Sequence, residues 1–132
     1  MSIKRTKQEL ESVESSKHSV ILPSVFELRF VKMSITGYGA EHSLWIYMGR
    51  SSDYLIVPDF FCSCKDFIIR TAISKVAPYC KHLIGVRLAI KERKYLEFST
   101  DMGSAAQIVQ EVLDKGFSPT LRKLIYSSKP KG

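Results

Sequence analysis

Two short stretches, Phe61-Cys62-Ser63-Cys64 and Cys80-Lys81-His82, decide how this chain folds. They form the pattern C-x-C, a gap of fifteen residues, and C-x-H, and they hold all three cysteines of the sequence. Residues two positions apart point the same way in an extended or turning segment, so each pair can bind one ion from one side. Three thiolates and one imidazole make a closed tetrahedral set for Zn²⁺. The pattern predicts a structural zinc site formed by Cys62, Cys64, Cys80 and His82.

The two other histidines are expected at the surface. His42 lies just before a predicted hairpin and is the alternative fourth ligand, but the C-x-H spacing favours His82 over both His42 and His18. If the cysteines were instead ordinary buried thiols, no such pairing would be expected of them.

Size and composition favour a metal over disulfides. The chain has 132 residues, enough for one domain with a small core that a metal would help to hold together. Three clustered cysteines do not suit a secreted disulfide framework, and the polar N-terminus has no apolar signal segment. No apolar run is long enough to span a membrane. We therefore expect an intracellular protein, in the cytoplasm or nucleus, without membrane contact.

Positive charge gathers around the cysteines. The net charge is +7, and residues 62–94 hold eight basic side chains against Asp66 and Glu92. Such a concentration attracts polyanions, although many basic runs are only the solvated face of a helix. The candidate nucleic-acid contacts are Lys65, Arg70, Lys75, Lys81, Arg87, Lys91 and Lys94.

Apolar periodicity before the cysteines predicts strands. Phe26, Leu28 and Phe30 alternate with charged residues, which indicates a half-buried strand over Val25–Met33. Ser43–Met48 and Tyr54–Val57 form a hairpin around the loop at 49–53. Tyr95–Phe98 is a candidate short closing strand.

Helices are predicted after Cys80. Leu83, Val86 and Ile90 fall on one face of the first helix. Ser104 is expected to cap a second helix that ends at Gly116, and Pro119 to begin a third. The fold class is thus α+β: a three-stranded antiparallel sheet, a zinc site, one helix, and two C-terminal helices. We divide the chain into a polar, frayed segment at 1–18, a zinc-finger domain at 19–98, and C-terminal helices packed on it at 99–132, with a disordered basic tail.

The ligand pattern and the order of elements resemble the SWIM-type zinc finger, in which a hairpin precedes C-x-C and a helix follows C-x-H. The similarity covers about residues 44–91, including Pro78 just before the third ligand; the fifteen-residue gap is longer than in the shortest members of the family. The resemblance implies zinc as cofactor and a non-enzymatic role in binding DNA or protein. A short chain of this kind is most similar to SWIM proteins that partner RecA-family recombinase paralogues in DNA recombination and repair.

Enzymatic alternatives are weaker. Cys64 and Arg70 have the C-x₅-R spacing of a cysteine-dependent phosphatase, but Phe67-Ile68-Ile69 is too bulky and β-branched to curl around a phosphate. The one-residue spacing of Cys62 and Cys64 does not match a thioredoxin-like redox site. Four protein ligands leave zinc no position for a catalytic water.

The aromatic residues of the hairpin allow two interpretations. Trp45, Tyr47 and Tyr54 could stack on bases if exposed, but packing in the core is the favoured interpretation.

Overall fold

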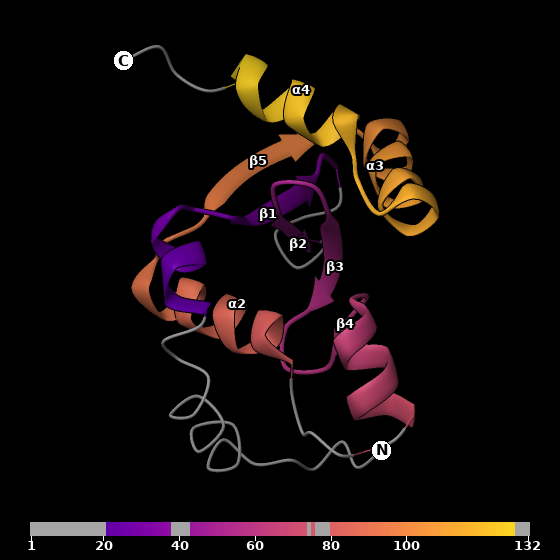
Figure 1. The fold of residues 1–132 in the computed structure, drawn as a ribbon. Coiled ribbons are helices and arrows are strands. Elements are labelled where there is room, and N and C mark those ends of the chain that lie inside the picture. The colour runs from indigo at the N-terminus through magenta and orange to yellow at the C-terminus, as the bar shows by residue number, and fades with distance from the viewer. Residues whose placement is uncertain (1–20, 38–42, 74, 76–79, 129–132) are drawn as a thin grey trace.

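A computed structural model describes residues 21–37, 43–73, 75 and 80–128 (Figure 1). The segment 1–18, the tail after Ser128, His18 and His42 lie outside these residues. In the described part, the strands are β1 (Phe30–Ile35), β2 (Ser43–Met48), β3 (Asp53–Val57), β4 (Phe61–Cys62) and β5 (Leu96–Thr100). The helices are the π-helix η1 (Phe67–Ile73), α2 (Lys81–Glu92), α3 (Met102–Lys115) and α4 (Pro119–Ser128), and residues 21–26 are also helical.

The strands form one mixed sheet in the order β4-β3-β2-β1-β5. β1 to β4 are antiparallel neighbours, and the predicted hairpin of β2 and β3 is confirmed. β5 runs parallel to β1 on the opposite edge from β4. The α+β class is therefore confirmed, but the predicted three-stranded antiparallel sheet is wrong in two respects: the sheet has five strands, and β5 makes it mixed.

Helices cover both faces of this sheet, α2 on one side and α3 with α4 on the other (Figure 1). Alternate strand residues divide between two cores: Phe30, Trp45 and Ile56 pack with α2. Val31 and Ile46 pack with α3 and α4. Consecutive strand side chains point to opposite faces, and helices cover both faces of this sheet. Consecutive strand residues are therefore both buried, which explains why both are apolar.

The predicted strand over Val25–Met33 is wrong in its first half. Residues 21–26 are helical, Leu28 has a φ of 58°, and the strand begins only at Phe30. Ile21 and Val25, four positions apart, are buried on the α2 side, whereas Phe26 is exposed. The spacing of four between Ile21 and Val25 indicates a helix, and this short helical pattern runs directly into the alternation of Phe26, Leu28 and Phe30 from which the strand was predicted.

Close packing of α2 on the sheet depends on Gly85. This glycine lies on the buried face of α2 together with Leu83. A Cβ at position 85 would lie closer than 3.0 Å to the Phe30 ring and the Ile21 side chain. The face predicted from Leu83, Val86 and Ile90 is correct for the first two, but Ile90 is exposed.

The C-terminal helices begin and end at recognisable caps. Asp101, rather than the predicted Ser104, caps α3 and accepts a hydrogen bond from the Ser104 backbone N–H at 3.0 Å. Gly116 ends α3 with a φ of 71°, and Pro119 begins α4, both as predicted. Among the described residues no helix is long and apolar enough to cross a bilayer.

A buried ion pair attaches α4 to the sheet. The Arg122 guanidinium donates to both carboxylate oxygens of Asp53 at 2.7 and 2.8 Å. The Ser118 backbone N–H donates to the same carboxylate at 2.7 Å. Arg122 also donates to the Gly49 carbonyl at 2.7 Å. Because the Asp53 side chain is fully buried, these donors are what makes its charge tolerable there.

We predict that Gly85→Ala destabilises the protein by about 1–3 kcal/mol, because the added methyl group overpacks the contact with Phe30 and Ile21. This loss exceeds the gain of about 1 kcal/mol that alanine gives in a helix interior. Urea unfolding would measure it. The matched control is Gly103→Ala in α3, whose Cβ would lie 3.1 Å from Oδ2 of the exposed Asp101 N-cap; because this side chain can shift, the change should cost less than Gly85→Ala.

Glu111 gives a pH-dependent prediction. Partial burial opposes its ionisation, but hydrogen bonds from Ser118 and Thr120 outweigh burial and lower the pKa of the carboxyl. The resulting stabilisation is present above the unfolded pKa of about 4.3 and is lost as the pH falls through the lower folded value.

Glu111→Gln should therefore cost about 1 kcal/mol at neutral pH, and the difference from the parent should shrink below about pH 4. Unfolding curves across this range would test it, with Asp114→Asn as an exposed control on the same helix. A difference that persists unchanged in acid would contradict the assignment.

Candidate metal centre

Separate elements bring the four predicted ligands together. Cys62 ends the edge strand β4, and Cys64 follows two residues later, before η1. Cys80 is the N-cap of α2, and His82 lies in the first turn of that helix. All four side chains are buried, and their ligand atoms lie within 4.8 Å of one another.

Hydrogen bonds hold the C-x-C turn in place. The Ser63 backbone N–H donates to the Leu55 carbonyl, and the Leu55 N–H donates to Ser63 Oγ, each at 2.9 Å. The Phe67 N–H then donates to Cys64 Sγ at 3.3 Å, where the helical segment begins. The intervening serine thus anchors the turn to β3 and leaves both cysteines directed at the same point.

The spacing of the ligand atoms fits one thiophilic cation. Zinc bonds of about 2.3 Å to sulfur and 2.0–2.1 Å to nitrogen give tetrahedron edges of about 3.4–3.8 Å. Cys62 Sγ and His82 Nδ1 are 3.8 Å apart. A buried Cys₃His cluster of these dimensions could hold a metal ion, with the imidazole nitrogen Nδ1 directed toward the sulfur atoms.

The thiols affect one another strongly. Hydrogen bonds from Cys62 and Cys80 lower the pKa of Cys64, against the effect of burial. The hydrogen bond to Cys64 and burial raise the pKa of Cys62. Although a hydrogen bond with Cys62 lowers the pKa of Cys80, its contact with Cys64 and burial raise it to about 12. Since three buried thiolates cannot coexist without a counter-charge, a bound divalent cation would replace thiol protons.

Two tyrosines position the imidazole. The His82 ring lies 4.5 Å from the Tyr47 ring and 4.9 Å from the Tyr54 ring. Tyr47 also stacks on Tyr54 and contacts Phe30 edge-on. Trp45 is buried and contacts Tyr95. Packing in the core is thus the observed use of these hairpin aromatics.

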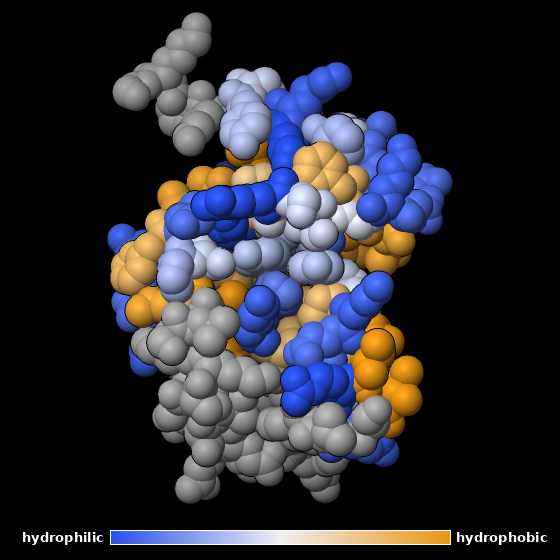
Figure 2. Space-filling model, viewed as in Figure 1, coloured by the Kyte–Doolittle hydropathy of each residue, from blue (hydrophilic) through white to orange (hydrophobic). Residues whose placement is uncertain are grey.

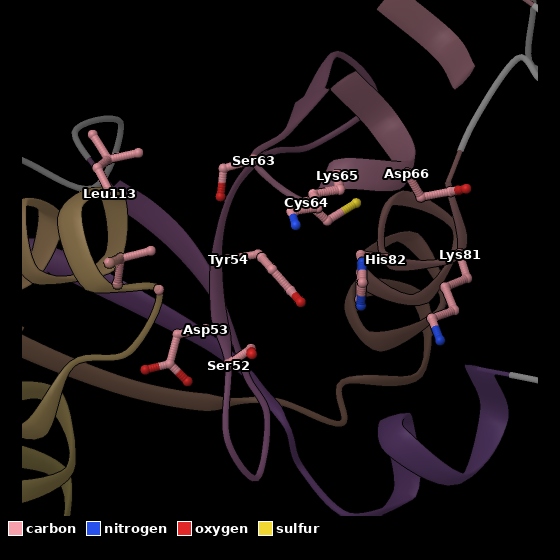
Figure 3. A pocket seen from close by; sticks show the side chains of 12 residues that line it. Ser52, Asp53, Tyr54, Ser63, Cys64, Lys65, Asp66, Lys81, His82 and Leu113 are labelled. Carbon is pink, nitrogen blue, oxygen red and sulfur yellow. The ribbon is translucent and has the colours of Figure 1, made fainter. Parts of the chain in front are cut away.

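A cleft adjoins the metal centre, and sequence reasoning did not predict it (Figure 3). It has a volume of about 830 Å³ and lies between β3, the C-x-C turn, the start of α2 and the end of α3. Tyr54 extends toward its middle, and Lys65 and Lys81 line the wall next to His82. Leu113 lines the opposite wall. Its residues come from four separate segments, so no local pattern could have revealed it.

The predicted basic residues divide into groups. Lys65 and Lys81 meet at the cleft, beside the ligands. Lys91 follows ten residues after Lys81, so it lies about 15 Å further along α2, and Lys94 lies beyond the helix end. Arg87 is half-buried and engaged in an interaction of its own. Arg70 and Lys75 are exposed, and Arg70 pairs with Asp66 at 3.6 Å.

Comparisons with protein-family models, with curated proteins and with solved structures gave no match for this chain. The site therefore has to be interpreted from its own chemistry. Cys64 lies buried with the other ligands, and Arg70 pairs with Asp66 on the surface of η1, which is not the arrangement of a phosphate-binding loop.

Removing one ligand should release the metal and loosen the fold. We expect Cys64→Ser to abolish stoichiometric metal binding. If free metal exceeds its Kd a thousandfold, binding stabilises the folded parent by about 4 kcal/mol, and the variant should lose at least this amount. Elemental mass spectrometry and urea unfolding would measure both effects.

Ser63→Ala is the matched control for this prediction. It removes only the hydrogen bond from the Leu55 N–H, so it should keep the metal and cost about 1 kcal/mol. A parent protein without metal affinity, or a Cys64→Ser variant that unfolds like the parent, would contradict the assignment of this cluster.

Proposed function

We propose that the chain is a non-enzymatic zinc-binding module of the SWIM type, acting as a DNA- and protein-binding accessory factor. The observation that carries this proposal is the buried Cys₃His cluster of Cys62, Cys64, Cys80 and His82. Its chemistry favours Zn²⁺, because soft thiolates with one imidazole in a closed, four-ligand arrangement suit structural zinc better than magnesium, calcium or manganese.

A structural role for the zinc follows from the number of ligands. With three thiolates and one imidazole, no position remains for water or substrate, so Lewis-acid chemistry has no place to act. What zinc supplies here is cross-linking: it joins the C-x-C turn after β3 to the first turn of α2. Binding partners must then be recognised by the surface that surrounds the cluster.

Lys65 and Lys81 support nucleic-acid binding. Both line the cleft beside the cluster, and both are exposed. The chain's net charge of +7 adds a long-range attraction for phosphates. The resulting interaction is with the phosphate backbone, so we expect little sequence preference and a steep dependence on salt.

The protein-binding part of the proposal rests on the resemblance to SWIM proteins. By that resemblance, the partner is a RecA-family recombinase paralogue and the process is DNA recombination or repair. Exposed apolar side chains near the metal centre support a protein partner independently of the resemblance.

The double substitution Lys65→Gln/Lys81→Gln tests the DNA-binding part. It should weaken binding of a fluorescent oligonucleotide at low salt and reduce the slope of log K against log salt by about 2, one unit for each phosphate that is no longer neutralised. Fluorescence anisotropy over a salt series, with zinc content checked in parallel, would measure it.

The charge-matched control is Arg93→Gln/Lys123→Gln, at the end of α2 and on α4, which removes the same charge from exposed positions that do not line the cleft. If both double variants lose the same affinity, the attraction comes from overall charge. If neither the parent nor the variants bind single- or double-stranded DNA, the DNA-binding part of the proposal is wrong.

A further inference from the structure

Exposed apolar side chains are concentrated on one short part of the chain. Of eleven large hydrophobic residues exposed in the described ranges, six lie between positions 57 and 73. They are Val57, Phe60, Phe61, Ile68, Ile69 and Ile73, and we call them the β4–η1 patch. Figure 2 shows hydrophobic residues gathered along the outer side of η1. A concentration of this kind marks an interaction site more often than scattered exposed leucines do.

Contacts between the elements make the patch one surface. Val57 and Phe61 are paired across β3 and β4. The Phe61 ring contacts the buried Phe67 of η1 edge-on, with ring centres 5.4 Å apart. Phe67 and Thr71 point inward, which leaves Ile69 and Ile73 outward with exposed fractions of 52% and 71%. Packing among the described residues therefore does not account for these isoleucines.

The backbone in this region restricts how a partner can bind and has an unusual helical geometry. β4 is the edge of the sheet and has only two residues, so β-sheet pairing from a neighbour is limited there. η1 is a π-helix, a geometry that is rare and frequent at functional sites. The Thr71 hydroxyl is buried without a hydrogen-bond partner among the described residues, which is a further cost of holding η1 in this position.

Charge decides which occupant fits. The exposed basic residues Lys65, Arg70 and Lys75 belong to the same segment, and among the described residues Arg70 alone of these three forms an ion pair, with Asp66. In a symmetric dimer through this patch, each basic rim would face its own copy, and the net charge of +7 would oppose association further. An acidic partner would instead gain from the same residues.

We propose that the β4–η1 patch is the docking surface for a protein partner that presents an apolar stripe flanked by Asp and Glu side chains. This inference rests on the protein-binding part of the proposed function, and it shares only Lys65 with the proposed DNA-binding cleft. Apolar contact with Ile69 and Ile73 supplies most of the affinity, and Lys65 and Lys75 select for acidic flanks.

The test uses metal-loaded full-length chain and two model peptides. Each peptide is an amphipathic helix of about 18 residues with leucines on one face. One carries glutamates on its other face, and the second carries lysines. Isotope-edited NMR titration would give both the Kd and the residues affected. We expect the acidic peptide to bind at least tenfold more tightly and to shift the amide signals of Phe61, Ile68 and Ile73.

Ile69→Ser/Ile73→Ser should weaken binding of the acidic peptide at least tenfold without loss of metal. The matched control is Met102→Ser/Tyr126→Ser, which removes apolar side chains of similar exposure, 47% and 64%, from α3 and α4. This control should bind the peptide within twofold of the parent. The metal content and the oligonucleotide affinity of both variants should equal those of the parent.

Several outcomes would overturn the inference. It would be wrong if the two peptides bound equally well, if the two double variants lost equal affinity, or if the amide shifts fell on another surface. If the parent sediments as a dimer and Ile69→Ser/Ile73→Ser sediments as a monomer, the patch binds a second copy of this chain. Binding to anionic phospholipid vesicles that the same variant abolishes would assign it to a membrane surface. Loss of oligonucleotide binding with retained peptide binding would overturn only the DNA part of the proposed function.

Discussion

The meeting of three buried thiols and one imidazole between the edge of the sheet and the start of α2 is the constraint on which the rest of this structure depends. Cys62, Cys64 and Cys80 are buried together with His82. Without a counter-charge, at most one of the thiols is stabilised as thiolate by its neighbours, as the lowered pKa of Cys64 and the raised pKa of Cys62 indicate. A bound divalent ion would remove this conflict and would fix the start of α2 against the edge of the sheet.

The position of α2 determines how the sheet is completed. β4 lies at one edge, and the next strand of the chain, β5, lies at the other edge beside β1. α2 spans this separation across one face, and Gly85 lets it approach the Phe30 ring closely. The opposite face is held by α3 and α4, which the buried pair of Asp53 and Arg122 attaches to the hairpin. One helix layer thus meets the sheet at the Cys₃His cluster, and the other is attached to it by a charge pair.

Local chemistry explains what the sequence could predict. The ligand set, the hairpin, Gly116 and Pro119 all follow from spacing or backbone preference within a few residues. The strand count and the cleft depend on contacts between distant segments, such as β1 with β5. The helical residues 21–26 were missed because Phe26 and Phe30 suggested alternation, although Phe26 is exposed and only Phe30 belongs to a strand. The π-helix at η1 has no distinct sequence signal, since its apolar run suits several structures.

The segment that supplies Cys64 also connects the two candidate surfaces, the cleft and the β4–η1 patch. Cys64 and Lys65 line the cleft directly before η1 begins, so the same turn that supplies a ligand joins the cleft to the β4–η1 patch. The gap between Cys64 and Cys80 contains η1, and binding both cysteines to one ion would close that gap into a loop with fixed ends. A loop closed in this way loses much of its conformational freedom before any partner arrives. A partner of the β4–η1 patch would then have less ordering to impose, and we expect its affinity to be higher when metal is bound.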